Sequence, residues 1–90
     1  MFYVYLIQSK KDHSFYTGYT NDLKKRFEQH NAELNKSTKF KAPFELVYYE
    51  AYRAQSDAKH RERMLKQHAQ AYVALKGRIK QSILNIPVSG

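Results

Sequence analysis

The sequence FYVYLIQ of residues 2–8 and the sequence SFYTGY of residues 14–19 decide the fold of this chain. Both runs are rich in tyrosine and aliphatic residues, and the polar sequence SKKDH of residues 9–13 separates them. This spacing predicts two antiparallel strands joined by a turn. Residues 2–7 are apolar or aromatic at every position, which is typical of a central strand that is covered on both faces.

The register of this hairpin depends on the length of the turn. A four-residue loop over residues 9–12 pairs Tyr5 with Tyr16 and Tyr3 with Gly18. The two tyrosines then stand side by side on one face of the sheet. Without a side chain, Gly18 lets another group approach the backbone.

A lysine-rich segment with helical periodicity follows over residues 21–34. The members of its apolar stripe are Leu23, Phe27, His30 and Leu34. At about 100° per residue, Arg26 lies about 60° from Leu23, at the edge of the stripe. We therefore expect Arg26 to point back towards the sheet. His30 has two readings: a histidine at the edge of the core, or a member of a site that includes Arg26 one turn earlier.

Residues 44–52 resume the strand pattern and predict a third strand beside the first. A second long helix follows, with Ser56 as its expected N-cap. The apolar seam of this helix is formed by Ala58, Leu65, Ala69 and Tyr72. A shorter helical tail is expected over residues 71–84. The sequence thus predicts one α+β domain over residues 1–90, a three-stranded antiparallel sheet flanked by helices.

Glu62 interrupts the seam of the second helix. It lies about 40° from Ala58 at the helical step, on the face expected to be buried. A buried carboxylate costs several kcal/mol unless a cation or good donors accompany it. One reading is an ion pair with Arg61, Lys66 or Arg26, and the other is a metal ligand.

The order Tyr3-Val4-Tyr5, a loop, Tyr16-Thr17-Gly18 and then Arg26 on the next helix resembles the GIY-YIG nuclease family. In that family a Gly-Ile-Tyr-like triplet precedes a Tyr-Ile-Gly-like triplet, and a helical glutamate follows. Here Tyr3 replaces the first glycine and Thr17 the second isoleucine. The resemblance covers residues 1–67 and is strongest to small stand-alone bacterial members. Homing endonucleases and the excision-repair incision nuclease share the motif.

The resemblance implies a catalytic site, whose members here are Tyr5, Tyr16, Arg26, His30 and Glu62. It implies that Glu62 is the protein ligand of a divalent metal, Mg²⁺ or alternatively Mn²⁺. One tyrosine would activate water and the other would orient the network, in either assignment. The family also uses an asparagine near the end of the domain to hold a phosphate, for which Asn85 is the candidate.

These residue types suit phosphodiester hydrolysis. Mg²⁺ binds readily through one carboxylate and several waters, and it accepts substrate oxygens as further ligands. Arg26 offers a permanently charged fork that matches phosphate. A tyrosine with the ordinary pKa of about 10 needs a nearby cation to act as a base.

The charge of the chain favours a polyanionic partner. Lys and Arg number 16 against 8 Asp and Glu, a net charge of +8 over 90 residues. We expect nucleic acid as the partner, DNA rather than RNA. The lysines expected to contact it are Lys24, Lys25, Lys39, Lys41 and Lys66.

The chain has no cysteine, no secretory leader and no apolar run long enough to cross a membrane. A cytoplasmic protein without membrane contact is therefore expected. The function we expect is a metal-dependent endonuclease, with a role in DNA repair or processing. The alternative is a nucleic-acid-binding module that keeps the fold without turnover. A basic protein-interaction module would explain the charge but not Glu62.

Overall fold

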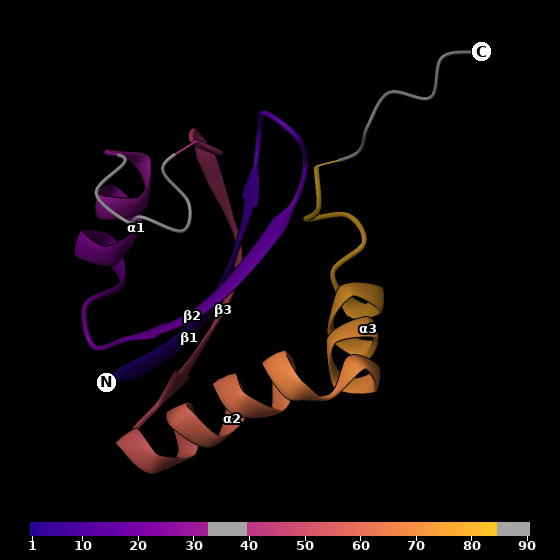
Figure 1. The fold of residues 1–90 in the computed structure, drawn as a ribbon. Coiled ribbons are helices and arrows are strands. Elements are labelled where there is room, and N and C mark those ends of the chain that lie inside the picture. Colours follow the sequence, from indigo (N-terminus) through magenta and orange to yellow (C-terminus); the bar gives the residue numbers. More distant parts are fainter. Residues whose placement is uncertain (33–39, 85–90) are drawn as a thin grey trace.

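A computed structural model describes residues 1–32 and 40–84 of the chain. The expected Lys39 and Asn85 contacts lie outside these residues. The elements in chain order are β1 (Phe2–Ser9), β2 (Phe15–Thr20), α1 (Leu23–Asn31), β3 (Phe44–Tyr52), α2 (Gln55–Gln67) and α3 (Ala69–Arg78) (Figure 1).

The three strands form one antiparallel sheet in the order β2-β1-β3. The continuous apolar run therefore lies in the central strand, as predicted, and Val4–Ile7 are 3% exposed or less. The α+β architecture is also confirmed. Because successive strand residues point to opposite faces, β1 contributes to two separate cores.

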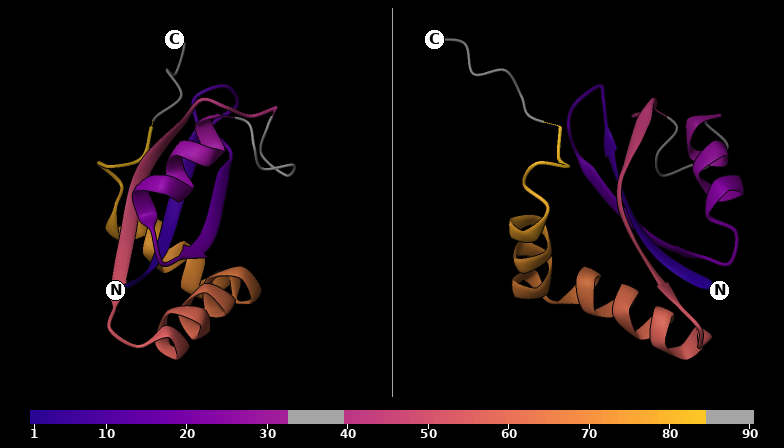
Figure 2. Two further views of the ribbon diagram at one scale, coloured as in Figure 1. Left: turned by 90° about the vertical axis from the view of Figure 1, so that its left-hand side faces the viewer. Right: turned by 180° about the vertical axis from the view of Figure 1, so that it is seen from behind.

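Helices cover both faces of the sheet (Figures 1 and 2). Val4 and Leu6 pack with residues of α2 and α3, which are Ala58, Leu65 and Leu75. Tyr5 and Ile7 pack on the other face with Phe44 and with Leu23 and Phe27 of α1. The sheet therefore separates α1 from α2, and a site that uses both helices has to reach around or through the sheet.

The expected register between β1 and β2 was wrong by two residues. Tyr5 pairs with Gly18, Tyr3 with Thr20 and Ile7 with Tyr16. A shift of two preserves the face of every side chain, so Tyr5 and Tyr16 still lie on the same face, on the diagonal rather than directly opposite.

The connection between β1 and β2 is longer than four residues because local hydrogen bonds hold it. Ser9 Oγ accepts hydrogen bonds from the backbone N–H groups of Lys11 (3.0 Å) and Asp12 (3.2 Å). Asp12 Oδ1 accepts from the N–H of Ser14 at 3.0 Å, and His13 adopts a positive φ of 66°. Serine and aspartate side chains compete effectively for turn backbone groups.

Helix boundaries also differ from expectation. Ala54 is the N-cap of α2 and has no side-chain capping bond, so the expected cap at Ser56 was wrong. His68, with φ −121° and ψ 102°, separates α2 from α3. The predicted tail helix over 71–84 therefore begins earlier, at Ala69, and ends at Arg78. None of the helices in the described residues is long and apolar enough to span a membrane.

Candidate active site

The Tyr5 hydroxyl joins β1 to α1. Its oxygen lies 2.9 Å from His30 Nε2 and accepts a hydrogen bond from Arg26 Nε at 3.3 Å. Tyr5 is 3% exposed and His30 is 4% exposed, so this contact is buried. Arg26 and His30 are one helical turn apart and therefore present their side chains to the same tyrosine. This placement is compatible with the hypothesis that His30 belongs to a site that includes Arg26.

Gly18 gives the Tyr5 side chain its position. A Cβ atom at Gly18 would overlap the Tyr5 hydroxyl oxygen and would lie 2.8 Å from Tyr5 Cε1. The phenol ring therefore extends across the backbone of β2, towards the outer edge of the sheet. We expected another group to approach Gly18; the group that does so is the side chain of its cross-strand partner, Tyr5.

The surroundings hold both Tyr5 and His30 in their neutral forms near pH 7. Burial raises the pKa of the Tyr5 hydroxyl above its ordinary 10.0; the hydrogen bond and charge of Arg26 oppose this rise, and the charge of Glu62 adds to it. Burial, and then the charge of Arg26, lowers the pKa of His30 below 6.5. A neutral His30 whose Nε2 lacks a proton can accept the Tyr5 hydroxyl proton.

Tyr16 lies on the same sheet face as Tyr5 but does not contact it directly in any hydrogen bond of the described residues. Its ring packs edge to face against Phe44, with centroids 5.7 Å apart. The Phe44 ring in turn packs against His30 at 5.9 Å. Tyr16 also lines a groove with Leu65, Lys66 and other residues at the outer side of β2.

Glu62 comes from the helix on the opposite face of the sheet. Arg61 lies about 60° to one side of the buried Ala58 and Glu62 about 40° to the other. Arg61 is paired with Glu50 of β3, so the Glu62 side of α2 faces β2. The charge of Glu62 is the smallest of the influences on the pKa of Tyr5, and among the described residues no hydrogen bond or ion pair joins Glu62 to Tyr5, Tyr16 or Arg26.

The immediate ion-pair partner of Glu62 is Lys66. Lys66 Nζ lies 3.2 Å from Glu62 Oε2, and the Glu62 side chain is 24% exposed. An i,i+4 pair of this kind contributes only about 0.3–0.5 kcal/mol. Neither Arg61 nor Arg26 pairs with Glu62 among the described residues. The reading of Glu62 as an ion-pair partner of Lys66 is therefore confirmed, and its half-buried carboxylate does not need a metal for stability.

Sequence reasoning missed a second carboxylate, Glu50. It accepts hydrogen bonds from Arg61 Nε at 3.0 and 3.1 Å and from Arg61 Nη2 at 3.0 Å, and from the hydroxyls of Tyr48 and Tyr52. Burial alone would raise the pKa of Glu50, but these bonds outweigh it and lower the pKa. The alternation of Tyr48, Glu50 and Tyr52 on one strand face was the available signal. Arg61, the residue that precedes Glu62, thus anchors α2 to β3 through Glu50.

Glu62 is the one acidic side chain that the expected site offers to a divalent cation. Among the described residues no group of three or more histidine, cysteine and acidic side chains gathers in one place. A metal would therefore be held by Glu62 and waters, which suits Mg²⁺ and does not suit Zn²⁺. The role of Glu62 as a metal ligand stays a prediction, and its carboxylate is paired with Lys66 in this structure.

The lysines expected at the nucleic acid have mixed placements. Lys24 and Lys25 are exposed on α1. Lys41 forms an ion pair with Asp12, which lies in the β1–β2 connection. Lys66 is paired with Glu62. Of the four lysines expected at the nucleic acid that lie within the described residues, Lys41 and Lys66 form ion pairs there and Lys24 and Lys25 do not.

Comparison with known proteins points to one family. A model of the GIY-YIG catalytic domain matches residues 1–78. A UPF0213 protein of Haloquadratum walsbyi is 40% identical over 67 residues, which cover 73% of this chain and 74% of that protein. A UPF0213 protein of Clostridium perfringens is 42% identical over 67 residues, which cover 73% of this chain and 71% of that protein.

A solved structure shows the same fold. The solution NMR structure of a UPF0213 protein from Bacillus halodurans is 33% identical in sequence and superimposes with a TM-score of 0.53. The match covers 91% of this chain and 93% of that chain. Sequence and fold thus agree with one family over most of the chain.

Proposed function

Because the chain belongs to the GIY-YIG family, we propose that it is a metal-dependent endonuclease that hydrolyses phosphodiester bonds in nucleic acid. DNA is the substrate we expect, in a repair or processing role. The observation that carries the proposal is the Tyr5 hydroxyl, held between His30 Nε2 and Arg26 Nε in a buried contact. Purely structural packing does not require this combination of a neutral imidazole and a guanidinium at one phenol.

The proposed proton transfer uses Tyr5 and His30. The attacking water gives a proton to the Tyr5 oxygen while the Tyr5 proton moves to His30 Nε2, so that Tyr5 stays neutral and His30 becomes imidazolium. This route avoids a free phenolate, which the raised pKa of Tyr5 disfavours. It assigns water activation to Tyr5 and leaves orientation of the network to Tyr16.

Arg26 would stabilise the negative charge of the phosphate directly, and Glu62 would do so through a bound metal ion. The Arg26 guanidinium has five N–H donors and uses Nε for Tyr5, which leaves donors for a phosphate oxygen. Glu62 would hold a Mg²⁺ ion, which supplies Lewis-acid stabilisation of the phosphate when it is bound. Lys66 would have to release Glu62 for this, at the small cost of an exposed ion pair.

A nucleic-acid-binding module without turnover is the second candidate. The ion pair between Glu62 and Lys66 favours it, because a carboxylate already neutralised by lysine needs no metal. The two candidates differ in what the substitution Glu62→Gln does. For the enzyme, loss of the charge removes the metal, and cleavage falls by orders of magnitude while affinity for DNA is kept or increased.

The test is to incubate the purified protein with single-stranded, nicked and branched DNA, with Mg²⁺ and with a chelator, and to repeat this for Glu62→Gln. Glu28→Gln removes the same charge from an exposed position on α1 and is the matched control. We expect Mg²⁺-dependent cleavage by the wild type and by Glu28→Gln, and almost none by Glu62→Gln. Equal cleavage by Glu62→Gln and the wild type would refute the assignment of Glu62. Tight binding without cleavage by the wild type would favour the binding module.

A further inference from the structure

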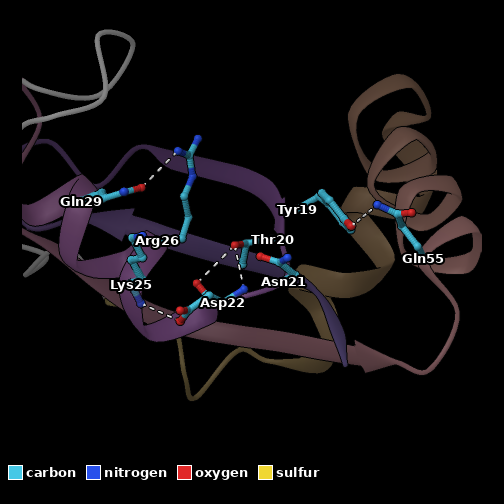
Figure 3. Close-up of a pocket in the computed structure, with 8 residues that line it drawn as sticks. All are labelled: Tyr19, Thr20, Asn21, Asp22, Lys25, Arg26, Gln29 and Gln55. Carbon is cyan, nitrogen blue, oxygen red and sulfur yellow. Dashed lines mark hydrogen bonds between the residues drawn. The ribbon is translucent and has the colours of Figure 1, made fainter.

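A pocket of about 410 Å³ lies next to Arg26, where β2 ends and where α1 and α2 begin (Figure 3). Its walls come from three parts of the chain: Tyr19 from β2, Lys25, Arg26 and Gln29 from α1, and Gln55 from α2. The function proposed above uses only Arg26 of these residues. The pocket thus adjoins the candidate active site without being part of it.

We propose that this pocket is the subsite for one nucleotide next to the cleaved phosphate, and that Gln55 reads the edge of its base. The inference rests on the proposed nuclease function for the location of the cut. It adds a ligand class, a single nucleotide of the substrate strand. It also adds a residue that determines which base is preferred at that position.

Arg26 connects the pocket to the candidate active site. Its Nε donates to the Tyr5 hydroxyl at 3.3 Å, and its Nη1 donates to Gln29 Oε1 at 3.5 Å. One guanidinium therefore contacts the tyrosine on one side and a wall of the pocket on the other, as Figure 3 shows for Gln29. A phosphate bound by Arg26 at the cleavage position would have its neighbouring nucleotide at or inside the pocket.

The charged groups of the pocket suit one nucleotide better than a run of phosphates. Lys25 and Arg26 are adjacent cations in its wall, while Asp22 contributes a carboxylate. Asp22 Oδ1 accepts a hydrogen bond from the Lys25 backbone N–H at 3.1 Å and caps α1. An anion in the wall repels a second phosphate, whereas the two cations attract the first.

The carboxamides supply the chemistry for a base edge. Glutamine presents both hydrogen-bond donors and an acceptor, which is the combination that base edges require and phosphates do not. Two such side chains line the pocket at opposite ends, Gln29 beside Arg26 and Gln55 beside Tyr19 (Figure 3). Gln55 Nε2 donates to the Tyr19 hydroxyl at 2.9 Å, which holds this carboxamide at the pocket.

Tyr19 forms a wall that is already held in place. Its ring stacks on Phe2, with centroids 6.4 Å apart and planes 8° from parallel. Lys59 Nζ lies 5.6 Å from the centroid of the same ring. A fixed wall preserves the position of Gln55, so little side-chain freedom is lost when a base binds. The pocket volume falls in the range of about 300–1,000 Å³ that holds one small ligand.

The test uses the four deoxynucleoside monophosphates and inorganic phosphate as probes, with NMR titration of the wild type in a chelator. We expect the side-chain amide signals of Gln29 and Gln55 to shift, and at least one nucleotide to bind more tightly than inorganic phosphate. Identical affinity for phosphate and all four nucleotides would overturn base reading. Shifts confined to residues outside the pocket would overturn the site itself.

Gln55→Ala is the decisive variant, because the side-chain hydrogen bond of Gln55 goes to Tyr19 and not to Tyr5 or Arg26. Loss of one hydrogen bond predicts affinity lowered about two- to tenfold for the preferred nucleotide, with a smaller spread among the four bases. Gln70→Ala alters the same residue type at an exposed position on α3 and should leave both values unchanged. Equal affinities for wild type and Gln55→Ala would refute the proposal.

These outcomes separate the subsite from the enzyme. Nucleotide binding at the pocket by a protein that never cleaves DNA would refute the nuclease and retain the nucleotide site. Cleavage by a protein whose Gln55→Ala variant has unchanged base preference in both binding and cut position would retain the nuclease and refute the subsite. The binding measurement requires neither metal nor turnover.

Discussion

The phenol ring of Tyr5 occupies the space that a side chain at Gly18 would need. A Cβ at Gly18 would overlap the Tyr5 hydroxyl oxygen and lie 2.8 Å from its Cε1. The glycine of the second motif triplet thus makes room for the tyrosine of the first, across one pair of strands. The position of the hydroxyl beside His30 and Arg26 depends on this relationship.

The substitution Gly18→Ala should therefore displace Tyr5 and break its contacts with His30 and Arg26. We expect the protein to lose about 1–3 kcal/mol of stability through overpacking, together with most of its cleavage activity. Denaturant unfolding and a cleavage assay measure the two effects. Gly77→Ala is the control: a Cβ there meets nothing within 4 Å, and alanine in a helix is favoured by about 0.5–1 kcal/mol. A Gly18→Ala protein as stable and active as the wild type would contradict the model of a shared space.

The pH dependence of cleavage should report His30. Proton transfer from Tyr5 requires a neutral His30, and burial followed by the charge of Arg26 lowers its pKa below 6.5. The rate should therefore stay level as pH falls through 6.5 and drop only at lower pH. Tyr5→Phe should reduce the rate about 10²–10⁴-fold, the usual contribution of a general base, with DNA affinity retained. The checks are a pH–rate profile and a binding titration.

The variant His30→Gln keeps a hydrogen-bonding group near Tyr5 but cannot take up a proton. It should lose the acidic fall in rate that the wild type shows, along with most of the rate itself. An acidic limb unchanged in His30→Gln would show that another group titrates and would remove His30 from the proposed transfer.

Stability in alkali should report the tyrosines around Glu50. Burial, then the hydrogen bond to Glu50 and its charge, raises the pKa values of Tyr48 and Tyr52 to about 12. A pKa that is higher in the folded state favours folding fully below the unfolded value of about 10. This contribution is lost as pH rises from there through 12. Denaturant midpoints measured across this interval should fall, and the double variant Tyr48→Phe, Tyr52→Phe should show a shallower fall; parallel curves would contradict the assignment.

Binding to nucleic acid should weaken strongly with salt, because the chain carries a net charge of +8. A single lysine that neutralises a phosphate of a single strand adds about −0.7 to the slope of log affinity against log salt. Lys25→Gln, in the wall of the pocket, should reduce the slope by about this amount. Lys80→Gln, exposed beyond α3, should leave the slope unchanged. A slope near zero for the wild type would argue against nucleic acid as the partner.

The arrangement of the second helix illustrates how far periodicity reaches. The burial of Ala58 and Leu65 was predictable, because it depends only on the helical step. Glu62 was expected on the buried face, but its side chain is 24% exposed, and the expected seam members Ala69 and Tyr72 belong to α3. The break at His68 and the anchoring of Arg61 by Glu50 were not predictable. The anchoring depends on how α2 lies against β3 in space. The break depends on the change of chain direction between α2 and α3.

The sequence by itself determined the strands, the helix stripe and the face on which each strand residue lies, because strand and helix periodicities are local properties of the chain. The alternation of side chains along each strand placed Tyr5 and Tyr16 on one face, even though the predicted register between β1 and β2 was wrong. Only the tertiary structure decided that Tyr5 pairs with Gly18, that its hydroxyl meets His30 and Arg26, and that α2 packs on the sheet face opposite α1. Register was decided by hydrogen bonds of Ser9 and Asp12 within the turn. The site was decided by the packing of α1 and α2 on opposite faces of the sheet. It was also decided by Gly18, whose missing side chain lets the Tyr5 ring reach the edge of the sheet.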